Sequence, residues 1–245
     1  MKARSWVLVA GFFIVGSAVA SCNDVIVNDG ERIAGSGNVI TESRDVSGFD
    51  EVVVLGSGDV FIDVTGTDSL TISADDNLMA VLTSDVNGSK LELGVEPNTP
   101  ISPSQEIEYQ ITVADLSAVT ILGSADFVVS DVDTPSFDVL IAGSGDVQVT
   151  GTTESLDVEI DGAGEFAGEG LVAARGSVSI AGSGSVVVNV TEDSHLLQLR
   201  GSGGGAAELR QRDGHPVPLV GDFLRHVNRH DARGQLALVS DEHDA

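Results

Sequence analysis

Acidic side chains recur at one fixed position of a repeated pattern in this chain. Asp126, Asp146 and Glu165 each stand three residues after the first glycine of a short motif, and Asp59 has the same place in an earlier motif. If the repeats stack as parallel strands, the first three carboxylates form a column with neighbours roughly 4.8 Å apart. Carboxylate oxygens are the ligands that Ca²⁺ prefers. Asp126, Asp146 and Glu165 are therefore candidate calcium ligands, and Ca²⁺ is the one cofactor that the sequence suggests.

A second interpretation of the same carboxylates needs no metal. A carboxylate that follows a tight corner can accept a hydrogen bond from a backbone N–H group of the corner, or it can face water. The sequence alone leaves both interpretations open.

The sequence contains few residues that could support nucleophilic catalysis, a transition-metal site or the binding of an acidic sugar. Histidine is absent between residues 35 and 190, so that stretch holds no Ser/His/Asp arrangement and no Cys/His metal cluster. His226 and His230 are spaced like ligands on a helix, but no third ligand accompanies them. Arg175 is nearly the only cation that could stabilise an acidic sugar. We therefore predict no catalytic residues and no enzymatic activity.

A glycine-rich tripeptide, Gly-Ser-Gly or a close variant, must position these carboxylates. From Gly123 onward its first glycine recurs in steps of 20, 19, 20 and 19 residues, at Gly143, Gly162, Gly182 and Gly201. Apolar residues stand two and four positions before each of these glycines and, after most of them, four and six positions beyond. This alternation is typical of strands with one buried face. A period near twenty is typical of stacked repeats.

The predicted fold is all-β. It is a parallel β-solenoid, or β-helix, in which rungs of about 20 residues run strand, Gly-Ser-Gly corner, strand. Stacking would bury Ile141, Ile160 and Ile180 in one column. An antiparallel sandwich is the alternative.

The first third of the chain is less regular. Ser69–Ile72 and Ile107–Val113 alternate like strands. Asn87-Gly88 separates two further strand-like runs and predicts a hairpin. We expect rungs here that carry an inserted hairpin and a loop.

The N-terminus has the pattern of a secretory signal. Lys2 and Arg4 precede an apolar run, and Val19-Ala20-Ser21-Cys22 resembles a bacterial lipobox. Cys22 is the only cysteine of the chain. We predict cleavage before Cys22, lipidation of Cys22, and attachment to a membrane through this lipid anchor. Ordinary secretory cleavage or an uncleaved anchor are the alternatives.

The charge of the chain limits its partners. Residues 22–199 hold 31 acidic and four basic side chains, and the whole chain has a formal net charge of −26. An acidic body of this kind argues against binding to nucleic acid. It favours divalent cations or basic partners.

Four segments follow from these patterns. They are a lipoprotein signal peptide (1–21), a polar tether (22–34), a repeat domain (35–203) and a divergent C-terminal segment (204–245). The last segment loses the apolar alternation and gains arginine and histidine. We predict that it is a weakly structured tail or the product of a frameshift.

The segment from Gly35-Ser36-Gly37 to Val60 resembles a known family. With Arg44, Phe49, the motif Ala74-Asp-Asp-Asn-Leu78 and the serial Gly-Ser-Gly-Asp elements, it is similar to the putative auto-transporter adhesin, head GIN domain family. The resemblance covers residues 35–199. It implies a bacterial envelope protein with a β-helix-like fold and a role in adhesion, and it carries over no catalytic residue.

The function predicted from the sequence is therefore that of an interaction protein. It would be non-catalytic, lipid-anchored at the outer membrane of the bacterial cell envelope, and would bind an unidentified envelope or surface ligand. The alternative is a scaffold that divalent cations stabilise and that binds glycan or lipid.

Overall fold

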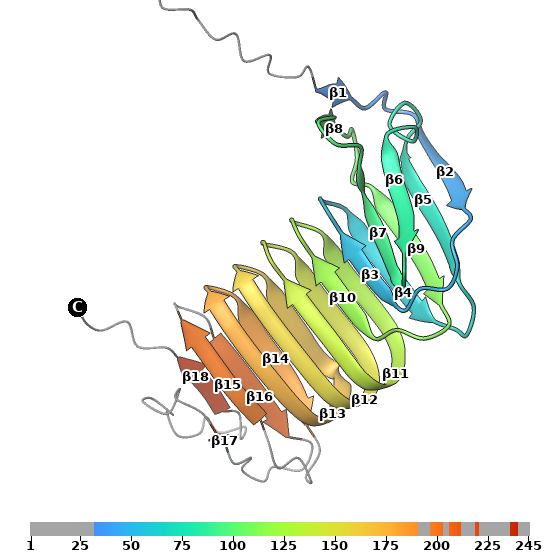
Figure 1. The fold of residues 1–245 in the computed structure, drawn as a ribbon. Helices are drawn as coiled ribbons and strands as arrows, with labels where there is room; N and C mark the ends of the chain where they lie inside the picture. Colours follow the sequence, from blue (N-terminus) through green and yellow to red (C-terminus); the bar gives the residue numbers. More distant parts are fainter. Residues whose placement is uncertain (1–31, 191–196, 203–205, 212–218, 221–235, 240–245) are drawn as a thin grey trace, which may run out of the picture. The chain divides into compact units, whose positions relative to one another are not determined.

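Strands are the regular secondary structure of the described residues (Figure 1), and no helix occurs among them. The computed structural model describes residues 32–190 and the strands at 197–202, 206–211, 219–220 and 236–239; it describes side chains as far as residue 189. The predicted all-β class is confirmed for these residues. They contain no apolar helix long enough to cross a bilayer.

The described residues form eighteen strands, which follow one another along the chain. They are β1 (Ile33–Ala34), β2 (Val39–Arg44), β3 (Glu51–Val54), β4 (Asp59–Val64), β5 (Ser69–Asp75), β6 (Leu82–Asn87), β7 (Lys90–Val95), β8 (Ile101–Ser102), β9 (Glu108–Val113), β10 (Ala118–Ile121), β11 (Asp126–Ile141), β12 (Asp146–Gly162), β13 (Glu165–Gly182), β14 (Ser185–Val190), β15 (Leu197–Ser202), β16 (Ala206–Gln211), β17 (Leu219–Val220) and β18 (Leu236–Val239).

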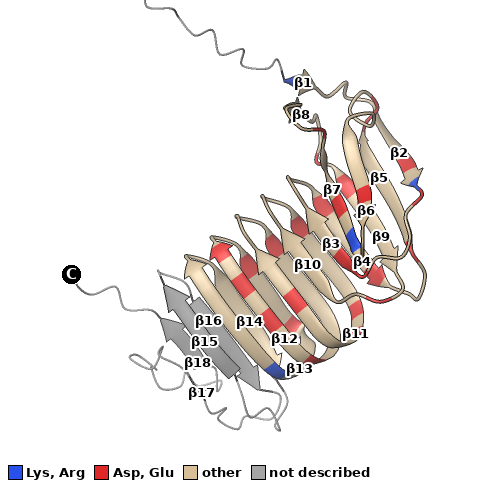
Figure 2. Ribbon diagram, in the orientation of Figure 1, with Lys and Arg blue, Asp and Glu red and all other residues tan. Residues whose placement is uncertain are grey.

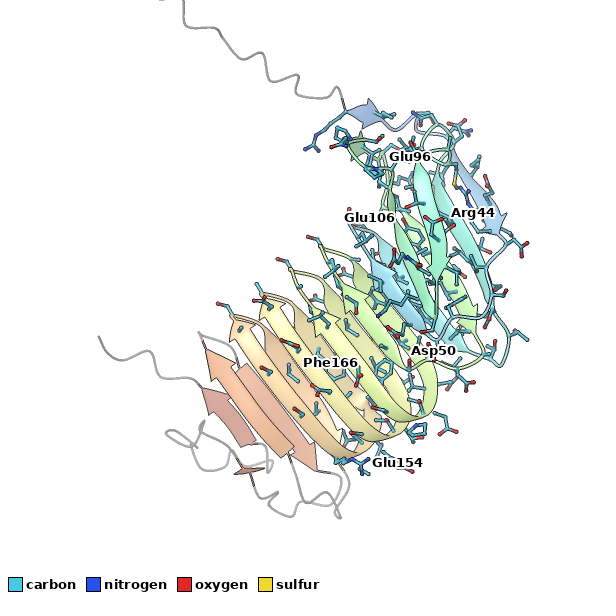
Figure 3. All side chains as sticks on the ribbon, in the orientation of Figure 1. Arg44, Asp50, Glu96, Glu106, Glu154 and Phe166 are labelled. Carbon is cyan, nitrogen blue, oxygen red and sulfur yellow. The ribbon has the colours of Figure 1, made fainter. Side chains whose placement is uncertain are left out.

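One series of parallel strands begins after the glycine corners, and we call it the leading series. It runs β9, β4, the first part of β11, the first parts of β12 and β13, then β14 and β16. Phe127, Val147 and Phe166 stand in register on successive strands and are buried; Phe166 is labelled in Figure 3. On each strand, the residues directly before and after the buried one point outward, as period-two alternation requires.

A second parallel series ends at the corners, and we call it the trailing series. It runs β7, β3, β10, the last parts of β11, β12 and β13, then β15 and β17. Ile141 pairs with Ile160 and Ile160 with Ile180, and all three are buried. The predicted isoleucine column is confirmed. Both series pair in parallel, so the antiparallel sandwich is not the arrangement of these repeats.

The corner glycines lie directly on one another. The carbonyl oxygen of Gly123 accepts a hydrogen bond from the Ser144 N–H group at 3.0 Å, and that of Gly143 accepts one from Ala163 at 2.9 Å. A β-carbon built on Gly143 would overlap the carbonyl group of Gly123, and one on Gly162 would overlap that of Gly143. The close approach of successive backbones therefore requires glycine at these corners.

Antiparallel strands flank the first repeats. β5 pairs with β9 and β2 pairs with β5, both antiparallel, which extends the leading series. β6 and β7 form the hairpin predicted at Asn87-Gly88, where Gly88 has a φ of 68°. The expected strand Ser69–Ile72 lies within β5, and β9 covers most of Ile107–Val113.

The last repeat departs from the predicted register. The spacing predicted that Leu199 would pair with Ile180 and that Gly201 would align with Gly182. Instead Val178 pairs with Leu199 and Ile180 with Gly201, a shift of two residues. The shift preserves the alternation of the strand. It also brings Leu209 opposite Val188, whereas the sequence offered only small residues at that point.

Strand pairing therefore does not stop at about Gly203. β16 extends the leading series, β17 pairs with β15 in parallel, and β18 pairs with β16 in the antiparallel sense. Leu209 lies opposite Val188 and Leu219 opposite Leu197, so strand pairing reaches into the segment for which the sequence predicted a weakly structured tail. The domain boundary itself and the origin of residues 204–245 stay predictions.

The glycine stack leads to a prediction about two glycines of the same motif. A Gly143→Ala substitution places a methyl group against the carbonyl group of Gly123. We expect a loss of about 1–3 kcal/mol in the free energy of unfolding, the range for overpacked sites. Gly56 is the control, because a β-carbon there meets nothing within 4 Å; Gly56→Ala should change stability by less than about 0.5 kcal/mol. Urea unfolding followed by circular dichroism measures both. Equal losses in the two variants would contradict the stacking argument.

Candidate functional site

A row of acidic residues crosses the leading series beside the glycine corners. Asp59, Asp126, Asp146 and Glu165 are the first residues of β4, β11, β12 and β13, and Figure 2 shows acidic positions that recur from strand to strand. Asp59 pairs with Asp126, and Asp146 pairs with Glu165. We call these four residues and Glu108 the acidic row.

Glu108 is the member of the row that the sequence did not reveal. It begins β9 and pairs with Asp59. No Gly-Ser-Gly motif precedes Glu108, so the spacing of the motifs does not point to this residue. The regular alternation of Glu108–Val113 was the available signal, since it places Glu108 on the outward face of that strand.

Hydrogen bonds to the backbone occupy part of the row. The Oδ1 atom of Asp126 accepts a hydrogen bond from the Asp146 N–H group at 2.9 Å, and Oδ1 of Asp146 accepts one from the Glu165 N–H group at 2.9 Å. Each aspartate therefore ties its own strand to the next one. The interpretation that these carboxylates cap backbone N–H groups is confirmed for Asp126 and Asp146.

The geometry gives the calcium prediction no direct support. Within the residues whose side chains are described, no group of three or more His, Cys, Asp or Glu side chains is arranged to hold a metal ion. Asp126, Asp146 and Glu165 remain candidate ligands by prediction only. Cys22, His226 and His230 lie outside the described residues.

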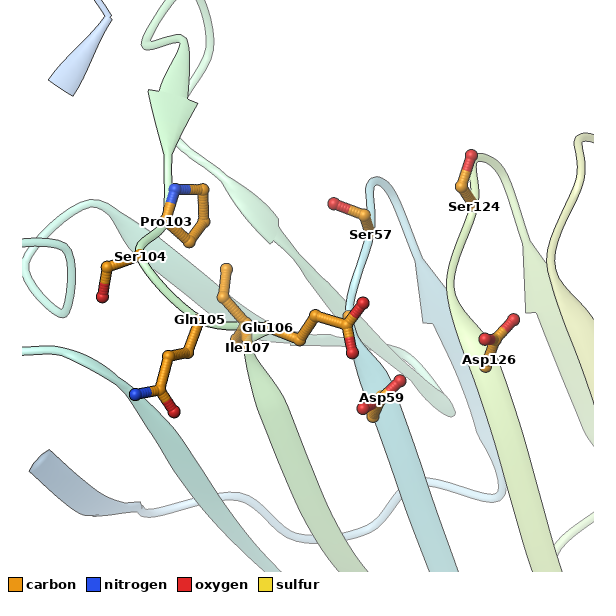
Figure 4. Close-up of a pocket in the computed structure, with 10 residues that line it drawn as sticks. Ser57, Asp59, Pro103, Ser104, Gln105, Glu106, Ile107, Ser124 and Asp126 are labelled. Carbon is orange, nitrogen blue, oxygen red and sulfur yellow. The ribbon is translucent and has the colours of Figure 1, made fainter. Parts of the chain in front are cut away.

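A pocket of about 350 Å³ opens at one end of the acidic row (Figure 4). The loop at 103–107 forms one side and the corners before β4 and β11 form the other. Glu106 reaches from the loop toward β4, where Asp59 lies, and Asp126 follows on the next strand. Ser57 and Ser124 add hydroxyl groups, and no basic residue lines the pocket. Such a lining suits a cationic group or a hydrogen-bond donor.

A second acidic group lies on the outward face of the trailing series. Asp138 pairs in register with Asp157, and Glu159 is two residues further along β12. Burial raises the pKa of Asp157, and the negative charges of Asp138 and Glu159 raise it further. These residues help to line a shallow pocket of about 250 Å³. Like charges in register repel, so this group carries unrelieved electrostatic energy.

A buried carboxylate joins the two motifs that suggested the family. Asp75 is 1% exposed. It accepts hydrogen bonds from the N–H groups of Gly37 and Ser104, both at 2.8 Å, and from the Ser104 hydroxyl group at 2.6 Å. Beside it Asp76 accepts hydrogen bonds from Ser36 and Asn38. We call this network the Asp75 clasp. It fastens residues 35–38 and the loop at 104 to the end of β5, so its role is structural.

Binding is one kind of chemistry that these sites can support. The described residues contain neither histidine nor cysteine. Carboxylates, hydroxyl groups and backbone groups can hold a cation or a polar ligand, but they offer no activated nucleophile of the Ser/His or Cys/His kind.

Comparisons with known proteins agree with this description. A family model for "putative auto-transporter adhesin, head GIN domain" matches residues 48–208. No curated protein matches the chain significantly.

Solved structures that resemble this chain include a putative adhesin and a putative lipid binding protein. A putative adhesin from Bacteroides fragilis NCTC 9343 is 19% identical, with a TM-score of 0.56, over 77% of this chain and 97% of that chain. A putative lipid binding protein from Parabacteroides distasonis ATCC 8503 is 21% identical, with a TM-score of 0.46, over 78% of this chain and 97% of that chain. At its low identity the Bacteroides fragilis protein shows a shared fold and nothing about a ligand.

The Asp75 clasp predicts how stability depends on pH. Its hydrogen bonds, led by that of the Ser104 side chain, hold the pKa of Asp75 below its ordinary value of 3.8. The stabilisation is therefore complete above that value and is lost as the pH falls through it toward the folded-state pKa. We expect Asp75→Asn to lower stability at neutral pH and to flatten the loss of stability below about pH 4.

Asp85 supplies the control for this measurement. It is exposed on β6, so Asp85→Asn should follow the wild-type profile of melting temperature against pH. An Asp75→Asn profile parallel to that of the wild type would contradict the role of the clasp.

Proposed function

This chain belongs to the family described as putative auto-transporter adhesin, head GIN domain, and on that premise we propose that it is a non-catalytic adhesion protein of the bacterial cell envelope. The observation that carries the proposal is the match of the family model to residues 48–208, because this segment contains the corners and most of the parallel strands of both series.

The character of the outward faces supports a binding role. Carboxylates begin five neighbouring strands of the leading series, at Glu108, Asp59, Asp126, Asp146 and Glu165, and the last three are exposed. A ligand with repeated or extended contacts could engage several strands at once. The absence of histidine and cysteine from the described residues supports a role without catalysis.

We propose further that the two parallel series are the two sides of one β-solenoid. The register steps of 19 and 20 residues between β11, β12 and β13 support this architecture, since each step returns the chain to the same position one strand away. A solenoid presents each outward position once per turn. Adhesive contacts could then be repeated along it.

The proposed attachment is a lipid at Cys22, at the outer membrane. The support is the sequence Val19-Ala20-Ser21-Cys22 after an apolar segment, with Cys22 the sole cysteine. A diacylglyceryl group with a third acyl chain would anchor the protein stably, because each buried methylene contributes about 0.8 kcal/mol.

The anchor and the adhesive role can be tested together. Cys22→Ser should abolish the incorporation of radioactive palmitate and move the protein from the membrane fraction to the soluble fraction. Cells that lack the protein should attach less well to the surfaces that wild-type cells colonise, because the adhesive module is missing. Wild-type protein should restore attachment, whereas the unanchored Cys22→Ser variant should not.

Ser21→Ala is the matched control, since a small residue before the cysteine is compatible with lipobox processing. It should retain labelling and attachment. Persistent palmitate labelling of Cys22→Ser would refute the lipid anchor. Normal attachment by cells without the protein would refute the adhesive role.

A second candidate function is a scaffold that divalent cations stabilise and that binds glycan or lipid. The observation in its favour is the repulsion between Asp138 and Asp157, which stand in register and which a cation between them would relieve. On this candidate, millimolar Ca²⁺ should raise the melting temperature, because ligands that bind only the folded state stabilise it. The rise should disappear in Asp157→Asn and persist in Asp85→Asn. No change in the wild-type melting temperature would exclude this candidate.

A further inference from the structure

An aromatic ring is exposed on the outward face of the leading series. Phe61 is 38% exposed, whereas its neighbours along β4, Val60 and Ile62, are fully buried. It stands in register with Val128 of β11, which is 37% exposed. The other aromatic side chains of the described residues are buried. The sequence pattern offers no packing reason for phenylalanine at this outward position.

Carboxylates flank the exposed ring on its own strand. Asp59 and Asp63 lie two residues before and two residues after Phe61, so all three side chains project from the same face of β4. Among the described residues, neither aspartate side chain takes part in a hydrogen bond or an ion pair. We call Asp59, Phe61, Asp63 and Val128 the Phe61 face.

The Phe61 face continues into the pocket beside the corners. Asp59 belongs to both, and Asp126, on the neighbouring strand, also lines the pocket with Glu106 (Figure 4). An apolar platform therefore adjoins a concave end that carries three carboxylates and no basic group.

We propose that the Phe61 face binds an arginine-bearing, basic segment of a partner protein, an inference that rests on the proposed adhesive function and names its partner class. A guanidinium group stacks on an aromatic ring and donates paired hydrogen bonds to flanking carboxylates. The carboxylates beside Phe61 and in the pocket provide this complement.

The negative charge of the Phe61 face favours a basic polypeptide over lipid and glycan ligands. Anionic lipid headgroups and acidic sugars would be repelled by these carboxylates and by the net charge of −26. A neutral glycan could donate hydroxyl hydrogen bonds to the carboxylates, but it supplies no opposite charge. A basic polypeptide segment supplies both a group that stacks on the ring and the opposite charge.

The test measures the binding of labelled oligoarginine, with oligolysine and oligoglutamate for comparison, to the mature protein in neutral detergent. Fluorescence anisotropy should show that oligoarginine binds more tightly than oligolysine, and that oligoglutamate does not bind. Phe61→Leu keeps an apolar side chain but removes the ring, and it should weaken oligoarginine binding about two- to fivefold. Phe61→Trp keeps a ring and should preserve or strengthen binding, so a folding defect in the leucine variant leaves the proposal testable.

Asp63→Asn and Asp161→Asn form the matched pair for charge. Both remove one exposed carboxylate, but Asp161 lies at the far end of β12, in the trailing series. Asp63→Asn should weaken oligoarginine binding clearly more than Asp161→Asn. Equal effects of the two, together with unchanged binding by Phe61→Leu and Phe61→Trp, would mean general electrostatic attraction and would overturn the proposal.

Two further outcomes separate this inference from the proposed function. Cell attachment that needs the protein but is unaffected by Phe61→Leu and Asp63→Asn would overturn the Phe61 face and leave the adhesive role intact. Binding of a neutral glycan that is lost in Phe61→Leu would overturn the assignment of a basic protein partner.

Discussion

The stacking of glycine on glycine at the corners is the constraint on which the rest of the structure depends. Each corner carbonyl group accepts a hydrogen bond from the following corner, as Gly123 does from Ser144. A side chain on Gly143 would occupy the place of the carbonyl group it must approach. This contact fixes the register at the corner. Since that register also aligns the residues that adjoin the corner on both sides, it sets which side chains lie over one another there, in the core and on the surface.

The same register brings like charges together on neighbouring strands. Backbone N–H groups compensate for this in the acidic row but not on the described part of the trailing series. In the acidic row, Asp126 and Asp146 each accept a hydrogen bond from a backbone N–H group of the next strand. The dipole of that peptide group stabilises part of the negative charge. On the trailing series, no hydrogen-bond donor among the described residues meets the side chains of Asp138 and Asp157, and burial, followed by the charges of Asp138 and Glu159, raises the pKa of Asp157. Stacked repeats therefore hold electrostatic energy that a bound cation or basic group can release.

Much of this arrangement could be predicted from the spacing of glycines and apolar residues, because both respond to local geometry. The isoleucine column and the hairpin at Asn87-Gly88 follow from alternation and turn chemistry alone. The register in which β15 pairs with β13 and β16 pairs with β14 could not be predicted. Gly201 continues the spacing of the motif, yet pairing moves by two residues so that Leu209 lies opposite Val188. Strand pairing outweighed the motif there. The sequence did carry a signal for Phe61, which is an aromatic residue in the outward phase of a strand.

The buried residues and the outward residues of the same strands are therefore under different structural constraints. Val60 and Ile62 are held by packing, and any replacement must keep the volume of the core. Asp59, Phe61 and Asp63 alternate with them and are free of that requirement, yet the backbone holds them at fixed spacing. A ligand that meets such a face finds its contacts already ordered, so little conformational entropy is lost from the protein on binding. Repeats of this kind can keep one core while the outward rows change, and the outward rows are where the specificity of an adhesion protein would reside.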